Sequence, residues 1–297
     1  KAVSLFAVLT VIAEVFFPVT IGNVRNMLMV DISKEEDIIL QLDRLGSKYG
    51  IFSDPAVSVF FCASGFAIGV CCWMAKTRGI AVLFLGLSGW GAVLTNKRGP
   101  MLSIIIAFIL IIFICSGASY KRKIRAAVFV GAIFIAAAVA YRKIPQIADW
   151  LETINSNTAS GKIRADIYGK LWDNFRENIM FGGGTKSTRK LLEGYDAHNI
   201  YLAALSENGL PGLIIMVTAF AVCLNRTVKI KNWFRKTKKR ELEIFTAYCI
   251  FGQLYFIFYG MTGNPMTEIY LLAFYFMCVG IPMRQYTRLS KVKGTVL

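Results

Sequence analysis

Long apolar segments recur along the chain and predict helices that cross a membrane. Each holds on the order of 20 residues with few charges, the length that a helix needs to cross a ~30 Å hydrocarbon core. Barrel strands are shorter and alternate apolar with polar residues, so the pattern favours an all-α, polytopic transmembrane helical bundle. Eight spans are expected, over residues 2–21, 56–75, 79–95, 100–117, 124–141, 200–224, 244–262 and 268–284.

A second pattern, with the period of an amphipathic helix, occupies residues 162–178 within a polar segment that runs from 142 to 199. Apolar side chains recur every four residues along one stripe, at Ile163, Ile167, Leu171 and Phe175. Such a helix is expected to lie flat on the bundle or in the outer interface of the membrane.

Basic residues gather in alternate connections and set the expected orientation. They follow the second, fourth, sixth and eighth spans, and the positive-inside rule assigns these segments to the cytoplasm. Both ends of the chain are then cytoplasmic. The expected parts are residues 1–141 with five spans and the outer loop 22–55, the large extracytoplasmic loop 142–199 that carries part of the site, and residues 200–297 with three spans and a cytoplasmic tail.

Composition agrees with a membrane protein, since 56% of the 297 residues are hydrophobic, more than in soluble domains. The net charge of +16 raises the alternative of nucleic-acid binding. We exclude it, because the charge is segregated by membrane side, and contact with anionic lipid head groups explains the basic run 226–240 better. The cysteines lack CxxC or Cys/His ligand spacing, so we expect no metal site and no disulfide. No cofactor is expected either.

The turn TNKRGP, residues 95–100, places Lys97 and Arg98 on the expected outer side, where positive charge opposes the orientation rule. A guanidinium is well suited to bidentate contacts with phosphate. Gly99 and Pro100 make a tight turn that starts the next helix and would fix the direction of Arg98. The alternative is a cation at a helix end whose side chain reaches the membrane interface.

The segment AHNIYLAALSENGLPG, residues 197–212, holds the single histidine of the chain. A neutral imidazole at His198 would accept a proton from an attacking hydroxyl, a task that suits its unperturbed pKa of ~6.5. A plain interfacial histidine is the alternative. Helical spacing puts Glu207 roughly opposite His198, so no dyad is proposed. Gly209 and Pro211 break the helix, which is tolerated where the backbone lines a cavity or is buried in protein.

Three other stretches carry ambiguous signals. Arg164 lies in the first turn of the amphipathic helix but outside its apolar stripe, as an ordinary solvated arginine would. Arg44 lies in a loop that contains several glycines. Glu14 interrupts the first expected span. An acidic residue inside a membrane span is by default a candidate functional residue. The alternative is that the span is assigned too long. GGGTKST at 182–188 is not interpreted as a P-loop, because it lacks a glycine immediately before the lysine and does not join a strand to a helix.

Taken together, these stretches resemble the O-antigen ligase/polymerase family of bacterial envelope membrane proteins, over roughly residues 44–284. TNKRGPML is similar to the family's short Arg-Gly turn before a transmembrane helix. SGKIRADIYGKLWDNFRENIMFGGGT is similar to its large outer loop, and AHNIYLAALSENGLPG to its His-Asn segment. Family members usually have more than eight spans, so several N-terminal helices are expected to be missing and the chain to be a fragment.

The resemblance implies a metal-independent, inverting GT-C-type glycosyltransferase of polysaccharide or lipopolysaccharide biosynthesis, in the bacterial inner membrane with its active site facing the outside. It implies a glycan on undecaprenyl diphosphate as donor and, as acceptor, a lipid-linked repeat (polymerase) or a lipid A core (ligase). Chain-length regulator or flippase proteins are further partners to expect. The matched motifs assign the diphosphate to Arg98, Arg164 and Arg44, the catalytic base to His198, and supporting positions to Asn199 and Glu207.

Two other functions stay open at this point. A transporter or flippase for an anionic glycolipid would need charge inside the spans, where Glu14 alone stands out. A non-catalytic component of an envelope assembly complex would leave Arg98, Arg164 and His198 scattered rather than convergent.

Overall fold

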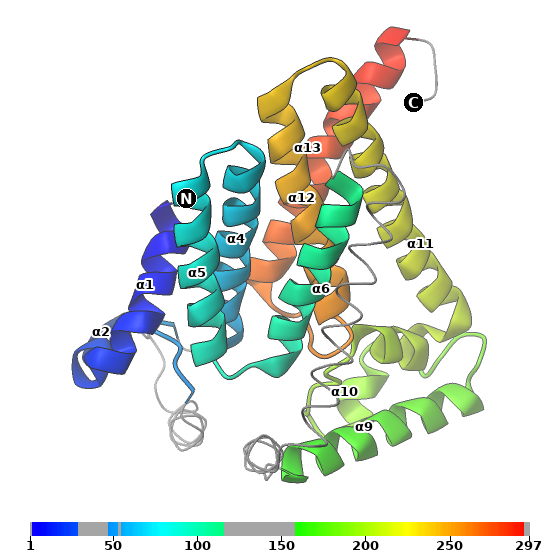
Figure 1. Cartoon of the computed structure of the whole chain (residues 1–297). Helices are drawn as coiled ribbons and strands as arrows, with labels where there is room; N and C mark the ends of the chain where they lie inside the picture. The colour runs from blue at the N-terminus through cyan, green and yellow to red at the C-terminus, as the bar shows by residue number, and fades with distance from the viewer. Residues whose placement is uncertain (1, 29–46, 53–54, 116–157, 294–297) are drawn as a thin grey trace, which may run out of the picture. The chain divides into compact units, whose positions relative to one another are not determined.

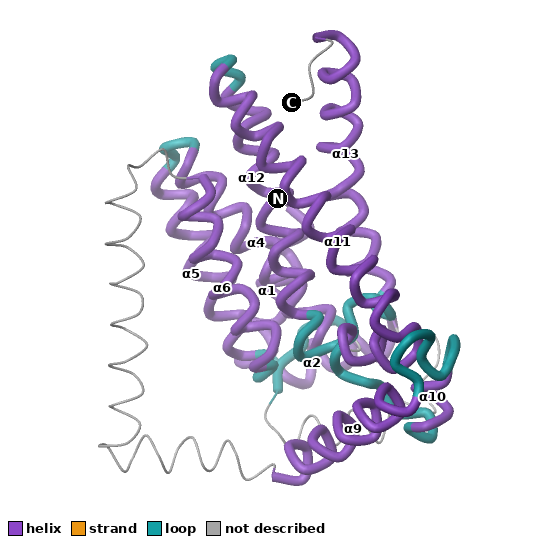
Figure 2. The backbone as a smooth tube through the Cα atoms, turned by 90° about the vertical axis from the view of Figure 1, so that its right-hand side faces the viewer, coloured by secondary structure: helices purple, strands orange, loops and turns teal. Residues whose placement is uncertain are grey.

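The computed structural model describes residues 2–28, 47–52, 55–115 and 158–293, which form helices joined by turns (Figure 1). No strand occurs among these residues (Figure 2), in agreement with the predicted all-α fold. The helices are α1 (Ala2–Phe16), α2 (Pro18–Leu28), α4 (Pro55–Met74), α5 (Arg78–Leu94), α6 (Arg98–Cys115), α9 (Thr158–Glu177), α10 (Ser187–Leu191), α11 (Ile200–Lys236), α12 (Arg240–Tyr259) and α13 (Ile269–Lys293).

Four of these helices are long and apolar enough to cross a membrane, namely α4, α6, α11 and α12, while α1 and α5 are shorter apolar helices. Helix α11 extends the expected span 200–224 as far as Lys236. The span expected at 124–141 lies outside the described residues, so the count of eight stays a prediction. Helices also occupy the spans expected at 56–75, 79–95, 100–117, 244–262 and 268–284.

The first expected span is divided in two. Residues 2–21 fold as α1, which ends at Phe16, and as the beginning of α2, which starts at Pro18. Proline lacks the N–H that would continue the hydrogen-bond ladder, and it disfavours helical geometry at the residue before it, Phe17. The segment expected as one span over 2–21 is therefore divided between two helices in the structure.

Glu14, near the end of α1, has buried partners for both of its oxygens. Its Oε1 accepts a hydrogen bond from Arg25 at 2.8 Å, and its Oε2 accepts the backbone N–H groups of Tyr49 and Gly50 at 2.8 and 2.7 Å. The Arg25 guanidinium also stacks on the Tyr49 ring, 3.9 Å from its centroid. This buried ion pair joins α1 to α2 and to residues 47–52, which gives Glu14 a structural role.

Contacts divide the chain into two compact units. The first contains Lys1–Ile111, His198–Tyr201 and Leu213–Leu297, and the second contains Ile112–Ala197 and Leu202–Gly212. In the first unit, α4 packs against α1, α5 and α12, and α12 packs against α13 (Figure 1, Figure 2). Small residues allow this close packing, because a side chain at Gly69 of α4 would collide with Leu85 of α5.

The second unit is built on α9, the amphipathic helix that the sequence predicts. The helix begins at Thr158, earlier than the expected residue 162, and ends at Glu177. Its apolar stripe is buried at Ile167 and Leu171. These two side chains form a cluster with Leu192, Ala197, Leu202 and Ala203. The stripe therefore packs against the segment that leads into α11 and against the first turn of α11.

Candidate functional site

Arg98 is the first residue of α6 and is exposed at the end of a short turn. Asn96 in this turn has a left-handed φ of 53°, and the hydroxyl of the buried Thr95 donates to the carbonyl of Ala92 at 2.7 Å. Pro100 follows in the first helical turn, where its missing N–H has no intrahelical partner to lose. This connection fixes the backbone that carries Arg98, and the direction of its side chain stays a prediction.

Gly99 packs against the turn that follows α12. A side chain at position 99 would collide with the hydroxyl and Cβ of Thr262, so the approach requires glycine. A side chain at Gly263 in the same turn would likewise collide with the ring of Tyr259. The beginning of α6 and the end of α12 therefore meet at the same end of the first unit (Figure 1).

His198 lies two residues before α11, is half-buried and has a left-handed φ of 51°. Asn199 follows it and caps the helix, because its Oδ1 accepts the backbone N–H of Tyr201 at 3.0 Å. Asparagine is among the strongest N-cap residues, since its side chain satisfies an N–H that has no helical acceptor. Asn199 therefore fixes the geometry by which the chain enters α11, directly after His198.

Two further hydrogen bonds hold the start of α11 on the end of α12. The backbone N–H of Ile200 donates to the carbonyl of Gly260 at 2.9 Å. The hydroxyl of Tyr201 donates to the carbonyl of Ile257 at 2.7 Å. The side chain of Ile200 also fills the space beside Gly260, where a Cβ would collide with it.

The turn at residues 260–263 contacts the backbone close to both candidate residues of the first unit, Arg98 and His198. It contacts α6 at the residue after Arg98, and it contacts α11 two residues after His198. The structure therefore supports the backbones of Arg98 and His198 on the same short segment, although these residues lie far apart in the sequence.

Arg164 belongs to the second unit, where it is exposed on α9 and lies off the buried stripe, as the sequence predicts. Burial raises the pKa of Tyr168 above its usual value, and the charge of Arg164 opposes this rise. The convergence of Arg164 with the two candidates of the first unit stays a prediction. Arg44 lies outside the described residues.

Helix α11 is broken at Gly209, whose φ of 65° and ψ of −168° are not helical. The break deprives two carbonyls of their helical donors. Pro211 has no N–H to offer to the carbonyl of Glu207, and the N–H of Leu210 bonds outside the helix instead of to the carbonyl of Ser206. Because buried backbone groups need partners, the break requires donors from elsewhere in the second unit.

The glycine-rich stretch 182–184 supplies these donors. Gly183 donates its N–H to the carbonyl of Ser206 at 2.8 Å, and Gly184 donates to that of Glu207 at 3.0 Å. The side-chain amide of Asn174 donates to Ser206 as well, at 3.0 Å to the carbonyl. The GGGTKST stretch therefore closes a helix break with its backbone, a role different from phosphate binding by a P-loop.

Glu207 accepts a short hydrogen bond from the hydroxyl of Thr188. Both residues belong to the second unit, so the expected support of His198 by Glu207 stays a prediction. Sequence reasoning misses Asn174 and Thr188, because neither lies near the break along the chain. The signal that could have indicated them is the break itself, since Gly and Pro in a helix predict freed backbone groups that polar side chains must satisfy.

Comparison with known proteins finds similarity to one family over part of the chain. A family model described as O-Antigen ligase matches residues 81–217. The matched range runs from α5 into α11 and includes Arg98, Arg164 and His198. It is narrower than residues 44–284, over which the sequence resemblance is expected. No curated protein matches the chain.

Proposed function

We propose, from the match of residues 81–217 to the family model described as O-Antigen ligase, that the chain transfers a glycan from undecaprenyl diphosphate to an acceptor glycan. The reaction takes place at the outer face of the bacterial inner membrane. The acceptor is another lipid-linked repeat if the protein is a polymerase, or a lipid A core if it is a ligase. The match to this family supports glycan transfer in general. The undecaprenyl carrier, the acceptor and a GT-C mechanism are what we propose in addition.

In this proposal, Arg98 and Arg164 bind the diphosphate and His198 is the catalytic base. The shared turn 260–263, which contacts the residue after Arg98 and the segment that begins at His198, supports the pairing of these two residues. Arg164 and Arg44 are retained as diphosphate ligands on the basis of sequence alone. Asn199 acts through the helix cap that orients the histidine segment.

In this proposal, these side chains carry the chemistry. The acceptor hydroxyl gives its proton to the imidazole of His198 and attacks the anomeric carbon of the donor sugar. The bond from that carbon to the phosphate oxygen breaks, and the diphosphate leaves with both electrons. Fixed guanidinium groups stabilise the charge that develops on it. Attack from the face opposite to the diphosphate inverts the anomeric configuration.

The first test is His198→Ala in membrane vesicles that are supplied with lipid-linked glycan. General-base catalysis contributes ~10²–10⁴-fold, so glycan transfer should fall by that order while the lipid diphosphate still binds. Normal transfer by this variant would overturn the assignment of His198.

The second test is Arg98→Lys, which keeps the charge but loses the bidentate fork of the guanidinium. We expect transfer to fall by ~10²–10³-fold, the typical effect of losing one oxyanion donor. Lys97→Gln is the matched control, because it removes the neighbouring charge and should change transfer little. Unchanged activity of Arg98→Lys would leave Arg98 as a cation of the membrane interface.

A further inference from the structure

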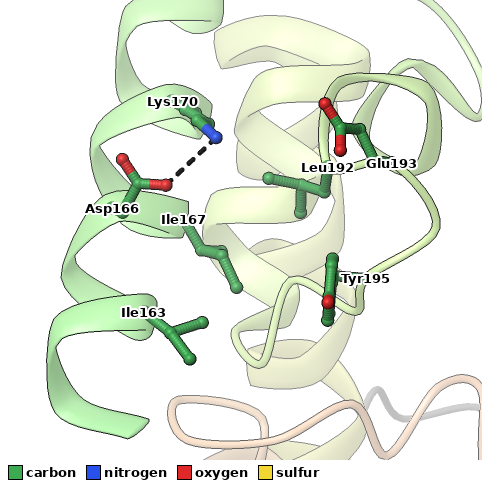
Figure 3. A pocket seen from close by; sticks show the side chains of 7 residues that line it. All are labelled: Ile163, Asp166, Ile167, Lys170, Leu192, Glu193 and Tyr195. Atoms are coloured by element: carbon green, nitrogen blue, oxygen red, sulfur yellow. Dashed lines mark ion pairs between the residues drawn. The ribbon is translucent and has the colours of Figure 1, made fainter. Parts of the chain in front are cut away.

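A pocket of about 410 Å³ lies within the second unit, between α9 and the turn that follows α10. Its volume falls in the ~300–1,000 Å³ range of small-ligand sites. Figure 3 shows side chains from both segments pointing toward one another across it. The residues that line it are Ile163, Asp166, Ile167, Lys170, Leu192, Glu193 and Tyr195.

The pocket has an apolar interior and a polar rim of mixed charge. Ile167 and Leu192 are buried, whereas Ile163 is half exposed at 53%. On the rim, Lys170 pairs with Asp166 at 3.0 Å, with side chains 50% and 65% exposed. Together with Glu193, these groups give the rim one ammonium and two carboxylates. An anionic diphosphate is therefore disfavoured here, which separates the pocket from the arginine site proposed above.

Tyr195 is the aromatic residue of this pocket, and it is 68% exposed. A tight turn holds it in place: Glu193 and Gly194 have left-handed φ values of 52° and 93°, and the N–H of Tyr195 donates to the carbonyl of Leu192 at 2.9 Å. Left-handed backbone is unfavourable for a residue such as Glu193 and tends to occur at ligand clamps. The turn places Tyr195 among the residues that line the pocket.

We propose that this pocket binds sugar rings of the glycan substrate, apart from the diphosphate. A pyranose has C–H faces that pack on Tyr195 and the aliphatic side chains. Its hydroxyls donate to the carboxylates of Asp166 and Glu193 and accept from the ammonium of Lys170. A neutral ligand with one apolar face and many hydroxyls satisfies every group that lines the pocket. The inference rests on the proposed function for the identity of the glycan as a substrate.

The test is a binding measurement that needs no catalysis. Short oligosaccharides released from the bacterium's own surface polysaccharide are titrated into the whole protein in lipid nanodiscs, and saturation-transfer NMR reports the sugar protons in contact. Tyr195→Ala should weaken binding about tenfold, as expected for loss of an aromatic contact. Glu193→Gln should weaken it too, whereas Tyr195→Phe, which keeps the ring, should bind nearly as the unchanged protein does.

Phe181→Ala is the matched control, because Phe181 is an aromatic of the same unit, 82% exposed, that does not line the pocket. Its binding should be unchanged. Equal binding by Tyr195→Ala, Glu193→Gln and the unchanged protein would overturn the pocket assignment, even if glycan transfer is observed. Binding that depends on Tyr195 in a protein without transfer activity would uphold the pocket and count against the proposed function instead.

Discussion

Asn199 shows how one side chain connects local structure with the proposed chemistry. Its cap on the N–H of Tyr201 sets the direction in which α11 begins, and His198 lies directly before it. Replacement of an N-cap asparagine by alanine costs ~0.5–2 kcal/mol. Asn199→Ala should therefore lower the thermal unfolding midpoint and also reduce glycan transfer, because the imidazole loses its fixed backbone.

Asn199→Asp is the control for this prediction, because aspartate caps helices about as well as asparagine. It should retain the unfolding midpoint of the unchanged protein. If the aspartate variant is as unstable as the alanine variant, the cap is not the reason for the loss, and the positioning role of Asn199 is wrong.

At the scale of elements, the break in α11 depends on one glycine. Gly209 has a backbone conformation that is nearly exclusive to glycine, and a Cβ there would collide with the carbonyls of Ile179 and Met180. Gly209→Ala should destabilise the protein by at least ~1–3 kcal/mol, seen as faster proteolysis of the 178–184 segment. Gly86→Ala is the matched control, since Gly86 lies in helical α5 with open space around it, and this change should be neutral or stabilising.

The ion pair of Glu14 and Arg25 makes a second prediction about elements. Both side chains are nearly fully buried, and removing one partner of a buried pair typically costs ~3–5 kcal/mol. Glu14→Gln should therefore loosen α2 and the 47–52 segment, which limited proteolysis can detect. Because the charge of Arg25 is the reason for the cost, adding Arg25→Met to Glu14→Gln should recover part of the stability. A double variant less stable than either single variant would contradict this account.

At the scale of the whole molecule, the sequence predicts the features that length and periodicity determine. Helices α4, α6 and α12 are apolar runs with polar ends, and α9 has a clear stripe. The sequence does not predict that Arg25 pairs with Glu14 or Thr188 with Glu207, 11 and 19 residues apart along the chain, because no periodic pattern links such positions. The turn 260–263 also escapes prediction, since its role depends on small residues that permit close packing and carry no chemical signal of their own.

Orientation in the membrane is the prediction on which the functional proposal depends most. The positive-inside rule places residues 182–188 outside and the basic end of α11 inside. Thr185→Cys, at an exposed position, should react with a membrane-impermeant maleimide that is added to intact cells. Lys236→Cys, exposed at the end of α11, should react only after the cells are permeabilised.

The seven native cysteines are buried or half-buried, so labelling of the unchanged chain gives the background for both variants. Labelling of Lys236→Cys in intact cells, with Thr185→Cys protected, would reverse the topology. Since residue 185 and His198 lie in the same segment 142–199 between expected membrane spans, that result would place the imidazole in the cytoplasm. The base would then lie across the membrane from the proposed reaction, and transfer at the outer face by His198 would be ruled out whatever the activity of the variants.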